Sequence, residues 1–392
     1  MIRIVLTASV VLLALTRVCG ADSIEIKIGY LGRPERVETL SLLAMPADND
    51  GLAGAELGID DNNTTGKFLG EHFSLEPRLL KGTDDAAAAA SDLLAHGVRL
   101  LIADLPAADL LKVADADRAA VLFNAGASDD ALREQDCRAN MVHTAPTRSM
   151  LADGLAQYLV WKQWRRWLMI VGSHPKDQLF ADALRRAATR FGAKIVQERV
   201  FEDTGGARRT DSGIVQIQRQ IPVLTQSAPA YDVLVAADES QVFADDLPYR
   251  TWDPRPVAGS AGLVPESWDA AFDQWGAVQL QNRFIRRFSR RMTALDLQAW
   301  SAARMIGEAA VRAAGSDADA VFAYIKSPAF ELAAFKGQKL TLRDWNLQLR
   351  QPILLADGRM VVSVSPQEGF LHPVTALDTL GYDRPETRCH LK

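Results

Sequence analysis

The stretch from residue 167 to 191, WLMIVGSHPKDQLFADALRRAATRF, limits the possible fold more than any other part of the chain. Its first five residues are apolar and predict a short buried strand, which a polar turn ends. Beyond the turn, Phe180, Leu184, Ala187 and Phe191 recur at helical spacing, and Asp177 is the expected N-cap of that helix. Strand, polar loop and helix form the unit of a parallel α/β sheet, in which ligands bind at the carboxyl ends of the strands.

The same unit recurs along the chain. The first half predicts strands at 24–31, 73–80, 98–103 and 120–123, with helices at 51–63, 84–96 and 106–116. The second half predicts strands at 167–171, 194–201, 232–237 and 257–259, helices at 149–164, 177–191 and 296–314, and a hairpin within 340–364. The segment 204–212 is expected to be a polar surface loop, and the arginine-rich segment 283–291 a solvated helix face. We therefore expect an α/β fold of two similar lobes, each a mainly parallel sheet flanked by helices and hinged by crossovers.

The first twenty residues have the pattern of a cleaved secretory signal. Arg3 precedes an apolar core from Ile4 to Leu15, and Val18-Cys19-Gly20 offers a cleavage site before Ala21. A lipoprotein signal is the alternative because of Cys19, although Thr16-Arg17-Val18 lacks the small residues that normally precede a lipidated cysteine. We expect an exported, periplasmic protein, with residues 1–20 as the signal peptide.

The mature chain is expected to be acidic. Removing residues 1–20 takes away two arginines and no acid, which leaves 42 basic and 49 acidic residues and a net charge of −7. This charge argues against nucleic acid or an anionic membrane as the partner. If Cys19 leaves with the signal, Cys137 and Cys389 remain. They could form a disulfide that fastens the C-terminal tail to the first lobe, or stay as two unpaired buried cysteines.

Several segments resemble the type I periplasmic solute-binding proteins of ABC transporters, in the branched-chain amino-acid group. Segment 51–66 is similar to the early helix of that group, FNAGAS at 123–128 to its first-lobe ligand loop, MVHTAPTRS at 141–149 to its crossover, and WSAAR at 300–304 to a late first-lobe helix. The resemblance implies a monomer that closes on a small molecule and docks on an inner-membrane ABC permease. It places lobe I at 21–145 and 256–338, and lobe II with the C-terminal tail at 146–255 and 339–392.

Three further segments resemble the subfamily associated with pyrroloquinoline-quinone (PQQ)-dependent alcohol oxidation. They are IGYLGR at 28–33, VGSHP at 171–175, and VAGSAGL at 257–263 ahead of Trp268. This resemblance implies PQQ or a related anionic small molecule as bound ligand, with no catalytic cofactor. PQQ is a flat ring system with three carboxylates, so its site needs cations and an aromatic face.

The candidate ligand-binding residues follow predicted strands or flank predicted crossovers. The candidate cations are Arg33, Arg148, His174, Lys176 and Arg255, and the candidate stacking rings are Trp252 and Trp268. Asn124 and Ser128 can donate to a carboxylate, and Gly126 permits close approach of backbone. Asp238, with its neighbour Glu239, would repel a trianion but would anchor an ammonium group, so these two acids discriminate between ligand classes.

Three alternatives to a quinone-binding protein remain open. The first is a protein that binds an amino acid or amide, although the candidate loops offer more basic residues than such sites normally contain. The second is a ligand-sensing regulatory subunit with the same two lobes. An exported enzyme is the third and is disfavoured, because Ser173-His174-Pro175-Lys176 matches S-x-x-K without the partner motifs of serine enzymes, and the six histidines have no metal-binding spacing.

Overall fold

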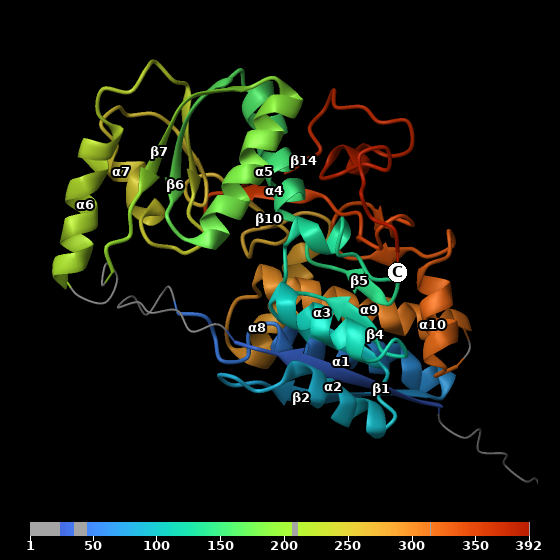
Figure 1. Ribbon diagram of the computed structural model, residues 1–392. Helices are drawn as coiled ribbons and strands as arrows, with labels where there is room; N and C mark the ends of the chain where they lie inside the picture. The colour runs from blue at the N-terminus through green and yellow to red at the C-terminus, as the bar shows by residue number, and fades with distance from the viewer. Residues whose placement is uncertain (1–23, 35–44, 206–210, 314, 392) are drawn as a thin grey trace, which may run out of the picture.

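The computed structural model describes residues 24–34, 45–205, 211–313 and 315–391. The expected signal peptide at 1–20 and part of the predicted 204–212 loop lie outside these ranges. Two parallel sheets, each flanked by helices, form two lobes (Figure 1). The predicted two-lobe α/β fold is confirmed.

Lobe I is built on a five-stranded parallel sheet in the order β2-β1-β3-β4-β5. Its strands are β1 (Ile24–Gly32), β2 (Glu71–Leu79), β3 (Leu100–Asp104), β4 (Val121–Asn124) and β5 (Met141–His143). Its helices are α1 (Leu52–Leu69), α2 (Ala86–Ala95), α3 (Ala107–Ala116), α8 (Ala277–Phe288), α9 (Ala294–Ala313) and α10 (Ala318–Ile325). Apolar residues on the two faces of the sheet form two buried clusters, one beneath α1 and α9 and one beneath α2 and α3.

Lobe II is built on a four-stranded parallel sheet in the order β7-β6-β8-β9. Its strands are β6 (Arg166–Gly172), β7 (Lys194–Phe201), β8 (Val233–Ala237) and β9 (Val257–Gly259). Its helices are α4 (Arg148–Trp161), α5 (Pro175–Phe191), α6 (Asp211–Thr225) and α7 (Leu247–Arg250). The strand of the 167–191 stretch, β6, thus lies inside this sheet between β7 and β8, and its helix α5 packs against the lobe II core.

Three chain segments cross between the lobes: β5 to α4, β9 to α8, and the segment that ends in β13 (Ile353–Ala356). The first and third crossings run side by side, since His143 N donates to Leu347 O and Leu349 N donates to His143 O, both at 2.9 Å. β10 (Val264–Glu266), β13 and β14 (Val361–Ser365) form an antiparallel sheet, as the predicted hairpin requires. Successive side chains of β13 alternate between the two cores, because Leu354 packs in lobe I while Ile353 and Leu355 pack in lobe II. This strand therefore joins the two cores directly.

Four details differ from the expectations. β9 pairs with β8, so residues 257–259 lie in the second sheet, although the predicted boundary at 256 assigned them to lobe I. α1 continues past Asn62 and Asn63, because their side chains bond the backbone of Ala303 and Phe73 instead of ending the helix. α6 was not predicted. Finally, the N-cap of α5 is His174 and not Asp177. Asp177 lies three residues further on, and its carboxylate accepts a hydrogen bond from the His174 amide in a capping box.

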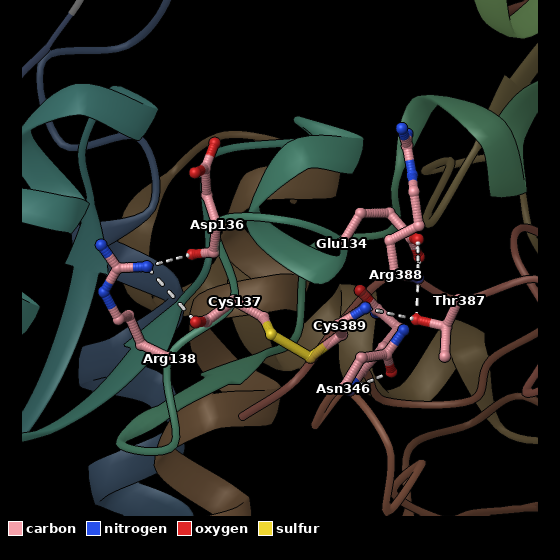
Figure 2. Close-up of a disulfide and its surroundings, with 9 residues drawn as sticks. Glu134, Asp136, Cys137, Arg138, Asn346, Thr387, Arg388 and Cys389 are labelled. Carbon is pink, nitrogen blue, oxygen red and sulfur yellow. Dashed lines mark hydrogen bonds between the residues drawn. A yellow bond between two sulfur atoms is a disulfide. The ribbon is translucent and has the colours of Figure 1, made fainter. Parts of the chain in front are cut away.

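The C-terminal tail returns to lobe I and is held there by a disulfide. Cys137 and Cys389 are bonded, with their Cα atoms 5.7 Å apart, so the first of the two alternatives for these cysteines is confirmed. Figure 2 shows Glu134 beside this bond, and its carboxylate accepts from Arg388 N at 2.7 Å and from the Thr387 hydroxyl at 3.2 Å. The bond closes a loop with a sequence separation of 252 residues.

Replacing both cysteines, Cys137→Ser with Cys389→Ser, is expected to lower the free energy of unfolding by about 2–4 kcal/mol, because the unfolded chain loses a long-range constraint. Urea unfolding followed by circular dichroism measures this change. Dithiothreitol should destabilise the unaltered protein to the same level and leave the double variant unchanged. Equal stability of both proteins under oxidising conditions would contradict the prediction.

Candidate functional site

The loop after β4 meets the start of α4 at the first interlobe crossing. Asn124 is fully buried, and its side chain shapes the loop by donating to Ala127 O at 2.8 Å and accepting from Ala127 N at 2.9 Å. Gly126 packs closely against the end of β3, since a Cβ there would lie 2.2 Å from Asp104 Oδ1 and 3.2 Å from Asp104 Cα. Ser128 O accepts from Arg148 N at 2.9 Å. Within the described residues, no acceptor is found for the amides of Gly126 and Ser128.

Arg148 is the residue that connects the two lobes at this point. Its side chain is only 8% exposed, and its Nε and Nη2 donate to the Glu239 carboxylate at 2.8–3.0 Å. Its Nη1 lies 3.3 Å from Asp129 Oδ2 in the β4 loop. Burial lowers the pKa of Arg148, but the carboxylates of Glu239 and Asp129 outweigh this effect and raise it overall. Since Glu239 follows β8, the carboxyl ends of one strand from each lobe meet at a single guanidinium.

The start of α5 borders the same region. Lys176 is exposed, and its charge lowers the pKa of Glu239 against a larger rise caused by burial. Asp177 accepts from His174 N at 3.1 Å and from Ser240 N at 2.9 Å, which ties α5 to the loop after β8. His174 Nε2 lies 2.8 Å from Asp203 Oδ2. We call Gly126, Ser128, Asp129, Arg148, Lys176 and Glu239 the interlobe site.

Asp238 is turned inward at the end of β8. It is 2% exposed, and its carboxylate accepts from the amides of Val242, Phe243 and Ala244 at 2.7–2.9 Å. Burial raises the pKa of Asp238, and these three amides offset part of the rise. The carboxylate therefore caps the following turn, and Glu239 is the acid of this pair that reaches the interlobe site.

Arg33 is held within lobe I. Its Nε donates to Asp109 Oδ2 at 3.0 Å, and its terminal nitrogens donate to the carbonyls of Gly82 and Asp84 at 2.6 Å. These bonds fasten the end of β1 to α3 and to the turn before α2. The structure does not bring Arg33 into contact with the other candidate residues.

The two candidate rings and Arg255 also lie apart from the interlobe site. Trp268 is 1% exposed and packs edge-on against Phe272 in the lobe I core, with ring centroids 6.0 Å apart. Trp252 is 62% exposed, and its amide donates to Thr225 Oγ1 in α6. Arg255 is exposed in the segment before β9.

Sequence reasoning missed three residues that organise the interlobe site. Asp129 directly follows the FNAGAS segment, so its position next to a candidate ligand loop could have marked it as a site residue. Arg133 and Gln348 are buried polar residues in stretches without apolar periodicity, and nothing in the sequence marks them. Their side chains contact the β4 loop and the first crossing.

A groove of about 850 Å³ lies elsewhere, on the outer side of lobe II between the end of β7 and α6. None of the candidate residues lines it. In the part of the chain that the structure describes, no group of three or more histidine, cysteine, aspartate or glutamate residues could hold a metal ion. The described helices also include none with both the length and the apolar character needed to cross a membrane.

Comparison with known proteins identifies the architecture. The family model of periplasmic binding proteins matches residues 26–219. A branched-chain amino-acid ABC transporter ligand-binding protein from Burkholderia xenovorans is 18% identical, with a TM-score of 0.68 over 86% of this chain and 95% of its own. A leucine-, isoleucine-, valine-, threonine- and alanine-binding protein from Brucella ovis, in a closed conformation, is 12% identical, with a TM-score of 0.68 over 94% of this chain and 99% of its own.

A third structure, an ABC transporter solute-binding protein from R. palustris in complex with benzoate, is 13% identical, with a TM-score of 0.65 over 93% of this chain and 99% of its own. No curated protein matches the chain. The chain therefore has the fold of type I periplasmic binding proteins, and over residues 26–219 its sequence is similar to that family.

Proposed function

We propose that this chain is the periplasmic solute-binding protein of an ABC transport system and binds a small molecule at the interlobe site. One observation carries the proposal: the loops after β4 and β8, one from each lobe, converge on Arg148. A ligand that replaces these contacts would be touched by both lobes, so its binding would favour lobe closure. The closed protein, a monomer, would then dock on an inner-membrane permease. The predicted signal peptide and the Cys137–Cys389 disulfide both support a location in the oxidising periplasm.

The charges of the interlobe site favour a ligand with charges of both signs. Arg148 and Lys176 stand against Asp129 and Glu239, so the site is already balanced. An anion that takes Arg148 alone would leave Glu239 without its partner, whereas a zwitterion supplies a carboxylate for Arg148 and an ammonium group for Glu239. The amides of Gly126 and Ser128 add donors for a carboxylate. We therefore propose an amino acid or a related zwitterion as the ligand.

PQQ is the second candidate. The clustering of Arg148 and Lys176 at the loop ends favours it, since a tricarboxylate needs more than one cation. Two of the other candidate cations contact carboxylates outside the interlobe site, Arg33 contacting Asp109 and His174 contacting Asp203. A trianion would also face Asp129 and Glu239, which is why this ligand ranks behind a zwitterion.

Calorimetric titration of the mature protein with L-leucine, a set of other amino acids, benzoate and PQQ tests the proposal. Arg148→Ala should lower the affinity for any ligand at this site by about 30-fold or more, because a charge-assisted contact is lost. Glu239→Gln distinguishes the two candidate ligands, since it should lower the affinity for an amino acid but raise the affinity for PQQ. Arg166→Ala is the matched control, because Arg166 pairs with Asp232 at the amino end of β6 and should leave affinity unchanged. If a ligand binds with the same affinity to the unaltered protein, to Arg148→Ala and to Glu239→Gln, the ligand does not bind at the interlobe site and the proposed site is wrong.

A further inference from the structure

Arg133 is a buried cation whose hydrogen bonds gather three separate segments. It follows the β4 loop, is 1% exposed, and sits on the lobe I side of the interlobe site. Its Nη1 donates to Ala127 O at 2.8 Å and to Asp129 O at 3.1 Å, both in the β4 loop. Its Nη2 donates to Ala145 O in the first crossing at 2.6 Å, and its Nε donates to Gln348 Oε1 in the third crossing at 2.9 Å.

Gln348 completes the connection from the third crossing. It is fully buried, and its Nε2 donates to the carbonyls of His143, Ala145 and Leu349 at 3.1–3.2 Å. Ala145 O therefore accepts from both Arg133 and Gln348. The pair links the β4 loop to the two crossings that run side by side.

We propose that Arg133, acting through Gln348, is the positioning residue of the interlobe site: it makes the β4 loop and the first and third crossings move as one body. The inference rests on the proposed function, since these segments carry Ser128, Asp129 and Arg148. Ser128 and Arg148 are joined by a backbone hydrogen bond of 2.9 Å, so a shift of the loop against the crossing would break the site's geometry. Arg133 itself lies behind the loop, and its bond to a residue of the site goes to the backbone carbonyl of Asp129 and not to a side chain.

The chemistry of the side chain explains why an arginine stands here. A guanidinium has five donors in one plane and can bond three segments at fixed angles, whereas an ammonium group is a point charge on a flexible stem. Burial lowers the pKa of Arg133 to about 9, against the charges of Asp130 and Asp129, which raise it. The group is therefore charged at neutral pH and needs its carbonyl acceptors to remain buried.

Hydrogen exchange of the full chain without ligand tests the coupling. Arg133→Lys should accelerate exchange about tenfold at the hydrogen-bonded amides of both segments, which are Ala127 in the β4 loop and Thr144, Ala145 and Arg148 at the first crossing. Arg290→Lys is the matched control, because Arg290 is also a largely buried arginine but donates to Asp296 and to Asn49 O within lobe I, away from the three segments. This control should lower thermal stability as Arg133→Lys does, but it should not change the exchange rates of these amides. Gln348→Met removes the same link with a similar side-chain volume and serves if Arg133→Lys does not fold.

A binding measurement completes the test. Affinity for L-leucine, or for whichever of the titrated compounds the unaltered protein binds, should fall about tenfold in Arg133→Lys and remain unchanged in Arg290→Lys. Faster exchange confined to one of the two segments, or unchanged affinity together with faster exchange at both, would overturn the inference and leave the proposed function standing. If the unaltered protein binds none of the compounds, the proposed function fails, and the exchange data alone decide whether the segments are coupled.

Discussion

Gly54→Val is expected to lower the free energy of unfolding by more than about 4 kcal/mol, enough to unfold much of lobe I. Gly54 lies on the face of α1 that packs against the start of α9, and a Cβ there would sit 1.9 Å from the carbonyl oxygen of Asp296. The obstructing atom belongs to the backbone, so no side-chain rotation can relieve the overlap. The two helices would have to separate and expose the core residues Ala53, Ala55 and Trp300.

Urea unfolding measures this loss, and Gly54→Ala should already cause most of it because the overlap begins at Cβ. Gly315→Ala is the control, since a Cβ at that position would meet none of the described atoms within 4 Å, its chain neighbours apart. It should change the free energy of unfolding by less than about 0.5 kcal/mol. A Gly54→Ala protein as stable as the Gly315→Ala protein would show that α1 and α9 do not approach each other as closely as the structure has them.

The α/β architecture could be predicted because its signals are local. Each buried strand is a short apolar run, and each helix presents an apolar stripe at its own spacing, so the order of elements follows from the sequence. The exceptions have a common cause. Asn62 and Asn63 suggest a helix end by their propensity, yet both use their amides to bond distant backbone and the helix continues. The missed helix α6 begins in a segment whose polar residues favoured a loop.

The candidate site was only partly predictable, because a polar residue after a strand can either face a ligand or hold its own loop. Asn124 and Asp238 do the second, through hydrogen bonds to Ala127 and to three amides of the following turn. Arg148 was found because the crossover resembles that of known binding proteins, while its carboxylate partners come from opposite lobes and are far apart in sequence. Which of these residues bind ligand stays a prediction until the titrations are done.

Buried cations were the least predictable feature. Arg133, Lys336 and Arg343 are each at most 2% exposed, yet the sequence around them has no apolar periodicity that would place them inside. Lys336 lies between the second and third crossings and donates to Ser267 O. Burial lowers the pKa of Lys336 to about 7, and the charge of Glu266 offsets part of this effect. In each case the acceptors come from segments that only tertiary folding brings together.

Asp378→Ala is expected to lower the free energy of unfolding by about 3–5 kcal/mol, because it leaves a buried guanidinium without its counter-ion. Asp378 is 1% exposed and accepts from Arg343 Nε and Arg350 Nε, each at 2.9 Å. The two arginines lie in the third crossing, and the aspartate lies in the C-terminal tail. Both guanidinium groups also stand 5.2 Å from the ring of Trp345. Losing the carboxylate therefore removes one link between the tail and the crossing. The buried guanidinium of Arg343 keeps its bonds to the carbonyls of Leu377 and Leu380 but loses the carboxylate that balances its charge.

A second substitution distinguishes this cause from a simple loss of contacts. Adding Arg343→Met to Asp378→Ala removes the unpaired charge, so the double variant should recover more than about 1 kcal/mol relative to Asp378→Ala alone. Arg350 is less buried and can turn its charge toward solvent. Asp344→Ala is the matched control, since Asp344 pairs with Arg384 on the exposed side of Trp345 and should cost less than about 1 kcal/mol. A double variant that is less stable than Asp378→Ala would contradict this explanation. The tail would then be held by the sum of its hydrogen bonds, and not by the balance of buried charge.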